Sequence, residues 1–146
     1  MIYTTYFANL KKTPEGVVPI AISRTVPEWY TGKRCPELAP SSAILREYKE
    51  TGDHMKMFED YLSKVLEGVD PNEVSGDLYT LAGATDIALV CYEKASDPCH
   101  RHALSVWFNS QGVPCVEWST YNMEQVNKLF DEGKSVEEVC QALLCL

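Results

Sequence analysis

The sequence predicts a three-layer α/β domain, a Rossmann-like fold with a mostly parallel sheet of four or more strands and a helical C-terminal tail. Two observations lead to this prediction. The run DIALVCYE at 86–93 is the most continuously apolar stretch, which is typical of a central strand covered on both faces. A helix-forming segment and another short apolar run follow it, as expected for a βαβ unit with parallel strands.

Length and charge limit the classes of partner. The chain has 146 residues, the size of one domain, and a net charge of −8 with a pI of about 4.8. Such a surface repels a phosphate backbone, so we expect no nucleic-acid partner. The charge is uneven, because residues 1–46 hold six Lys or Arg and three acids, whereas residues 47–146 hold seven and eighteen. A small anion should therefore bind near the N-terminal third.

Targeting signals and cysteines indicate the compartment. No apolar run is long enough to span a membrane, and the first residues lack the pattern of a signal peptide. We therefore expect a cytoplasmic protein without a membrane partner. Thiols stay reduced in that compartment, so disulfides are not expected. The chain has six cysteines: Cys35, Cys91, Cys99, Cys115, Cys140 and Cys145.

The first half of the chain predicts two strands and then helices. β-branched and aromatic runs at 2–7 and 17–23 predict the strands, and a long irregular connection with three prolines follows at 24–40. Three helices should separate this connection from the central strand. A serine at 41 or 42 caps the first, which ends near Glu50. Apolar residues at helical spacing over 57–66 form the second. Asp70 and Pro71 begin the third, which runs to about Ala82.

The second half predicts a helix, a strand and a tail. Asp97 as cap and Pro98 as first helical residue place a helix that ends near Gly112, and a strand follows at 113–118. Two amphipathic helices should then lie at 122–133 and 134–146, the second with a capping box of Ser135 and Glu138. We divide the chain into an α/β domain over 1–118 and a helical tail over 119–146. The tail could cover a sheet edge, pack on the domain or form a dimer contact.

Reactive side chains gather around the central strand. Cys91 and Glu93 end the strand, and Cys99, His100 and Arg101 should lie in the first turn of the next helix. Ligands of open α/β sheets bind beyond the carboxyl ends of the strands, near helix N-termini. The local positive potential there favours a nucleophilic thiolate at Cys99, and Glu93 could act as a general base. In a purely structural interpretation, Cys99 turns into the core and Glu93 forms a salt bridge with Arg101.

The same residues carry a resemblance to a known family. The segment VCYEKASDPCHRHALSVWF resembles the signature of the domain of unknown function 488 family, in which a Cys-x-Glu precedes a Cys-His-Arg. IYTTYF, ISRTVP and MFEDYLSKVL resemble the first strand, the second strand and the middle helix of that family, so the resemblance covers about residues 1–118. Many members have an aspartate two residues before the arginine of the second strand, where this chain has Ile22.

The resemblance implies one pocket at the strand ends. Its residues would be Arg24, Cys91, Glu93, Cys99, His100 and Arg101. Two guanidinium groups beside a helix N-terminus suit a phosphate or a carboxylate. Trp29 and Tyr30 could stack on a base or ring above the pocket, with Lys33 and Arg34 meeting phosphates, or they could simply pack the loop.

These residues lead to three hypotheses of function. In the first, the pocket binds, and could process, an anionic nucleotide-like or phosphorylated small molecule, with Glu93 or Cys99 as the catalytic group. In the second, the same pocket binds or sequesters such a ligand without turnover. In the third, Cys91, Cys99, His100 and His102 hold a metal. We place the metal last because adjacent Cys99 and His100 should point to different sides of a helix. The sequence names no cofactor.

Overall fold

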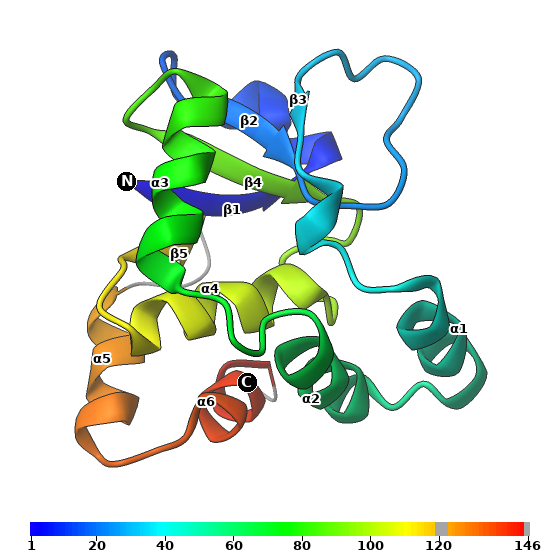
Figure 1. The fold of residues 1–146 in the computed structure, drawn as a ribbon, viewed down its shortest axis with the longest axis vertical. Coiled ribbons are helices and arrows are strands. Elements are labelled where there is room, and N and C mark those ends of the chain that lie inside the picture. Colours follow the sequence, from blue (N-terminus) through cyan, green and yellow to red (C-terminus); the bar gives the residue numbers. More distant parts are fainter. Residues whose placement is uncertain (119–122, 145–146) are drawn as a thin grey trace.

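Five strands form one parallel sheet in the computed structural model, which describes residues 1–118 and 123–144 (Figure 1). The strand order is β3-β2-β4-β1-β5. The strands are β1 (Ile2–Tyr6), β2 (Val18–Ala21), β3 (Lys33–Arg34), β4 (Ile87–Cys91) and β5 (Cys115–Glu117). The prediction of a parallel α/β sheet is therefore confirmed. Sequence reasoning missed β3, because two exposed residues that pair only with Ile20 and Ala21 leave no apolar run.

The central position predicted for the apolar run is also confirmed. β4 lies between β2 and β1, and all five of its residues are buried. Ile87 and Leu89 face the main hydrophobic core, whereas Val90 faces a smaller cluster on the other side with Phe7 and Tyr30. Apolar side chains at consecutive positions are needed because successive residues of a strand point to opposite faces.

The helices form a thick layer on the main-core face. They are α1 (Ser42–Thr51), α2 (His54–Lys64), α3 (Pro71–Ala82), α4 (His100–Ser110), α5 (Met123–Asp131) and α6 (Val136–Leu144). Two 3₁₀ helices, η1 (Phe7–Lys12) and η2 (Pro36–Leu38), complete the elements. η1 and the loop that contains Tyr30 form the thinner layer on the other face, which gives three layers. α5 and α6 contact α4 and contribute Val126 and Val139 to the main core.

Side-chain caps begin α1, α3 and α6 where the sequence predicts. Asp70 accepts a hydrogen bond from the Asn72 amide, so α3 begins at Pro71. The capping box is confirmed as well, because the Ser135 amide donates to Glu138 and the Glu138 amide donates to Ser135. α2 begins three residues earlier than its apolar spacing indicates, since Asp53 caps it.

The predicted start of α4 is wrong. The helix begins at His100, and its N-cap residue is Cys99 rather than Asp97. Lys94 to Asp97 close a turn of their own, in which the Asp97 amide donates to the Lys94 carbonyl oxygen at 3.0 Å. Pro98 therefore precedes the helix, and Cys99 has an extended backbone with φ of −151° and ψ of 144°. This shift by two residues brings Cys99 and His100 together.

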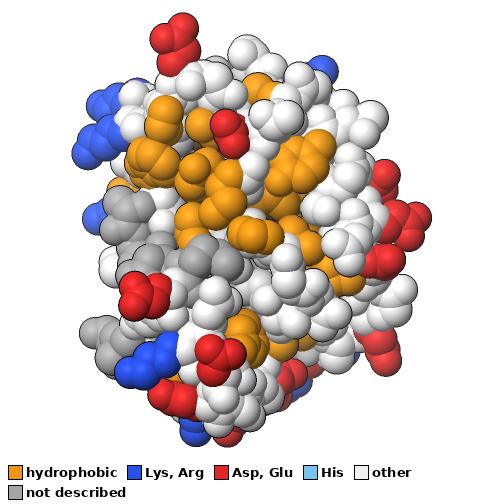
Figure 2. Space-filling model, turned by 90° about the vertical axis from the view of Figure 1, so that its left-hand side faces the viewer, with side chains coloured by type: hydrophobic (Ala, Val, Ile, Leu, Met, Phe, Trp, Pro, Cys, Tyr) orange, Lys and Arg blue, Asp and Glu red, His pale blue; other side chains and the backbone are white. Residues whose placement is uncertain are grey.

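Hydrophobic side chains gather on the left-hand side of the molecule as drawn in Figure 1, the side of α3 and β5, away from α1 (Figure 2). Among the residues that the structure describes, no helix is long and apolar enough to cross a membrane. The predicted domain boundary at 118–119 adjoins residues 119–122, which lie outside the described residues. Cys145 lies outside them as well.

Candidate functional site

A pocket of about 210 Å³ lies beyond the carboxyl ends of β2 and β4, where ligands of open α/β sheets bind. Four residues predicted for the site line it, namely Arg24, Cys91, Glu93 and His100. The other lining residues are Ser23, Thr25, Pro40, Leu45, Lys49 and Tyr92. The pocket therefore joins the end of the central strand, the start of α4 and the exposed side of α1.

Positive charge dominates the α1 side of this pocket. Arg24 and Lys49 line the pocket, and both also line an adjoining hollow of about 290 Å³ that adds Arg46 and Ser42. Within residues 1–118 and 123–144, none of these three cations forms an ion pair with an acid. Their charges are thus available to an anionic ligand. Sequence reasoning missed Lys49 and Arg46, which look like ordinary solvated positions of an amphipathic helix.

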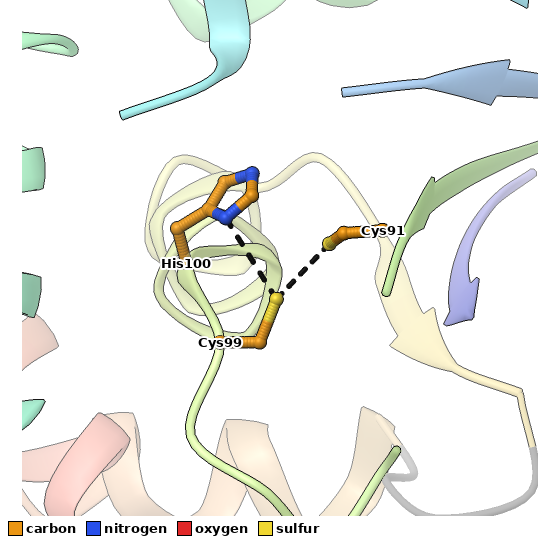
Figure 3. A group of neighbouring side chains, drawn as sticks. All are labelled: Cys91, Cys99 and His100. Atoms are coloured by element: carbon orange, nitrogen blue, oxygen red, sulfur yellow. Dashed lines mark hydrogen bonds between the residues drawn. The ribbon is translucent and has the colours of Figure 1, made fainter. Parts of the chain in front are cut away.

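Two thiols and an imidazole meet between the end of β4 and the start of α4 (Figure 3), and two of these residues, Cys91 and His100, line the pocket. The Sγ atoms of Cys91 and Cys99 are 3.0 Å apart, and the Cys99 Sγ lies 3.7 Å from the His100 Nδ1. The His100 Nε2 donates to the Ile22 carbonyl oxygen at 2.8 Å. The expectation that Cys99 and His100 diverge is therefore wrong, because Cys99 lies before the helix and not within it.

Arg101 lies behind this cluster and is fully buried. Its Nε and Nη2 atoms donate to the Glu117 carboxylate at 3.1 Å and 2.8 Å, and its Nη1 donates to the Cys91 Sγ at 3.7 Å. The hydroxyl of Thr4 also donates to Glu117. The structural interpretation, in which Arg101 forms a salt bridge with Glu93, is therefore wrong about the partner. Glu117 of β5 is the acid that pairs with Arg101, and the guanidinium group is buried in this pair.

The charged surroundings shift several pKa values. Burial raises the pKa of the Cys91 thiol well above its usual value, and the neighbouring Cys99 adds to this effect. Burial also opposes ionisation of Cys99, but the hydrogen bond from Cys91 and the charges of His100 and Arg101 outweigh it and lower its pKa well below the usual value. Glu93 is exposed at the rim, yet partial loss of water and the nearby Cys99 raise its pKa to about 7.

The aromatic residues of the loop after β2 lie apart from the pocket lining. Tyr30 is buried, packs edge to face on Phe7 at 5.3 Å and donates its hydroxyl proton to the Lys33 carbonyl oxygen. Trp29 is 60% exposed and packs on Phe7 at 6.1 Å. Tyr92, which contacts Phe7 as well, is the aromatic residue that reaches the pocket. Stacking of a ligand on Trp29 or Tyr30 stays a prediction.

A larger cavity of about 430 Å³ lies elsewhere, between η2, the segment that follows α2, and α3. Its lining is mainly aliphatic and includes Glu37 and Asp77, so it disfavours an anion. Cys35, which belongs to this lining, donates to Glu37 at 3.4 Å, and burial raises the pKa of its thiol to about 11. Although this cavity is larger, the strand-end pocket is the better candidate for an anion site, because its lining holds the cationic side chains Arg24 and Lys49.

Glu117 is the main component that sequence reasoning missed. A signal was present: in a strand, residues two apart face the same side, and Glu117 shares a face with the buried Cys115. A carboxylate at a core position needs a cationic partner. The sequence does not show which cation it is.

Comparison with known proteins gives a family and no activity. A family model described as "Active DUF488-N3 subclade" (DUF488-N3a) matches residues 5–112. No curated protein and no solved structure matches the chain.

Proposed function

The chain belongs to the DUF488-N3a family, and we propose that its strand-end pocket binds a phosphorylated or nucleotide-like small molecule. The observation that supports this proposal most is the pair of Arg24 and Lys49 on one pocket wall, without acidic partners among the described residues. Arg101, which sequence reasoning assigned to the ligand, is occupied by Glu117. In this proposal, Arg24, Lys49 and Arg46 bind the anion.

A local cluster of this kind can overcome the repulsion from a net charge of −8. Each charge-assisted hydrogen bond contributes roughly 1.5–3 kcal/mol, and exposed charges more than about 10 Å away are largely screened by salt. The pocket of about 210 Å³ is smaller than the roughly 300–1,000 Å³ of typical small-molecule sites. The adjoining hollow shares Arg24, Leu45 and Lys49 with the pocket and supplies further room.

Glu93 is the group best placed to act on a bound ligand. It lines the same pocket as Arg24 and Lys49, whereas Cys99 is 2% exposed and does not belong to the lining. A general acid or base needs hydrogen-bond reach of the ligand, which favours Glu93. Nucleophilic attack by Cys99 stays a prediction. A pocket that binds without turnover is the second candidate, because the cations alone suffice for affinity.

Calorimetry with AMP, ADP and glucose 6-phosphate tests the binding, with adenosine and glucose as uncharged counterparts. We expect the native protein to bind at least one phosphorylated probe and neither uncharged compound. Arg24→Gln should weaken that binding about tenfold or more, the equivalent of one charge-assisted hydrogen bond. Lys128→Gln on α5 is the matched control and should bind as the native protein does. Absence of binding to every phosphorylated probe, or equal affinity in Arg24→Gln, would refute the proposal.

Turnover is tested separately by chromatography of the probe after incubation with the protein. A new product that Glu93→Gln no longer forms, while calorimetry shows that the variant still binds the probe, would support Glu93 as the catalytic group. A bound probe that is recovered unchanged would support the binding module and contradict catalysis on that probe.

A further inference from the structure

The cluster of Cys91, Cys99 and His100 presents three soft ligand atoms within 4.8 Å of one another. The residues come from the end of β4 and the start of α4, so the sheet and the helix hold them in place (Figure 3). All three are buried, with exposed fractions of 1%, 2% and 6%. Thiolate and imidazole are ligands of zinc, whereas magnesium and calcium prefer oxygen.

The hydrogen bond of His100 leaves one ring nitrogen ready to bind a metal. A carbonyl oxygen only accepts, so the Nε2 that contacts the Ile22 carbonyl at 2.8 Å carries the proton. In the neutral ring, Nδ1 then has its lone pair, and Nδ1 is the atom that faces the Cys99 Sγ. A histidine that ligates a metal almost always donates its other ring N–H in this way, which fixes the tautomer and the ring orientation.

The distances fit a tetrahedral ion after a small adjustment. Zn–S bonds of about 2.3 Å and a Zn–N bond of about 2.0–2.1 Å at tetrahedral angles place two sulfurs about 3.8 Å apart and a sulfur about 3.6 Å from the nitrogen. The Cys99 Sγ is already 3.7 Å from Nδ1. The two Sγ atoms, now 3.0 Å apart, would need to separate by less than about 1 Å.

Charge balance also favours a divalent cation here. Two buried thiolates would repel each other at this separation, but a divalent ion between them makes the group neutral. Arg101 and Glu117 already neutralise each other, so the Arg101 Nη1 can serve as a hydrogen-bond donor to Cys91 without adding net charge. Such a donor to a ligating sulfur is a typical outer contact of a metal site.

We propose that Cys91, Cys99 and His100 bind a Zn²⁺ ion whose fourth position opens toward the strand-end pocket. The opening follows from the pocket lining, which includes Cys91, His100 and Glu93. Three protein ligands with one open position are typical of catalytic zinc sites. This inference rests on a separate observation from the anion pocket and gives Cys99 the role of a ligand, which leaves Glu93 for proton transfer.

Titration of the reduced, metal-free protein with Co²⁺ and then Zn²⁺ tests the proposal. We expect one Co²⁺ per chain, with the intense visible bands of tetrahedral cobalt and a sulfur-to-cobalt charge-transfer band, and displacement of Co²⁺ by Zn²⁺. Loss of a residue that only contacts a ligand lowers metal affinity about 10–100-fold. Because Cys99 is a ligand itself, Cys99→Ser should lower the affinity for the metal by more than that. Cys140→Ser removes a buried thiol of α6 outside the cluster and should bind as the native protein does.

The native protein alone can overturn the inference, even if a variant does not fold. Complete reduction is verified by thiol counting, so that a disulfide between Cys91 and Cys99 cannot mask the site. If the reduced protein takes up neither ion, or shows the weak bands of octahedral cobalt, the cluster is not a zinc site. Native affinity in a folded Cys99→Ser variant, with folding checked by circular dichroism, would contradict it as well. The anion pocket is tested separately, by comparing the binding of AMP or glucose 6-phosphate to the native protein and to Arg24→Gln, so failure of one proposal does not decide the other.

Discussion

Replacing Glu117 by Gln should remove a large part of the stability of this protein. Gln keeps the shape of the side chain but carries no charge, so the fully buried guanidinium of Arg101 loses its counter-charge. Breaking a buried ion pair by removal of one partner costs about 3–5 kcal/mol. Domains of this kind have a free energy of unfolding of about 5–15 kcal/mol. We therefore expect Glu117→Gln to lose about a fifth or more of the total free energy of unfolding.

Urea unfolding followed by circular dichroism measures this loss, with Glu59→Gln on the exposed side of α2 as the control. A double-mutant cycle then isolates the pair. Arg101→Met alone leaves the buried Glu117 carboxylate without its cation and should cost a similar amount. Arg101→Met with Glu117→Leu should cost much less than the sum, because neither charge of the pair is then left buried without its partner. If Glu117→Gln loses less than about 1 kcal/mol, or no more than Glu59→Gln, the buried charge is compensated in another way and our reasoning is wrong.

Other predictions concern the helices. Gly76→Ala in the interior of α3 should stabilise the protein by about 0.5–1 kcal/mol, since the new methyl group meets open space, whereas Gly83→Ala should destabilise it by about 1–2 kcal/mol because Gly83 has φ of 64°. Urea midpoints that move in the same direction for both would contradict this. The hydrogen bond from Lys56 lowers the pKa of Asp60, so its stabilisation is present above pH about 3.9 and is lost as the pH falls through the lower pKa of the folded state. Asp60→Asn should therefore flatten the acid limb of stability against pH, and identical limbs would exclude such a role.

Local signals predicted the fold well. The continuous apolar run of β4 needs cover on both faces wherever it lies, and Asp70 followed by Pro71 begins a helix without help from distant residues. Asp97 followed by Pro98 has the same form and failed. Around Asp97 the chain instead closes a turn through the hydrogen bond from the Asp97 amide to the Lys94 carbonyl, and the helix begins only after Cys99. Sequence alone does not rank two local solutions of similar energy.

The site was predictable in part, for a different reason. Four predicted residues lie at the ends of elements that meet at one edge of the sheet, so topology alone brings them to the pocket. Cys91 ends β4, Arg24 and Glu93 follow strands, and His100 begins α4. Arg101 was assigned to the ligand because its partner is distant in sequence. The partner is on β5, which pairs with the far side of β1. Pairing of a buried charge depends on three-dimensional register, which the order of residues does not contain.

The partnership of Arg101 with Glu117 limits how the family segment could be transplanted. The family match ends at residue 112, and Glu117 follows it. A chimera that contains only residues 5–112 on another scaffold would include the buried Arg101 but lack Glu117, the carboxylate that pairs with it. The host protein would have to supply a carboxylate on a strand next to β1. Otherwise Arg101, which donates a hydrogen bond to the Cys91 Sγ, would be buried without its counter-charge. The smallest transplantable unit of this site therefore includes Glu117 together with Arg101 and extends through β5.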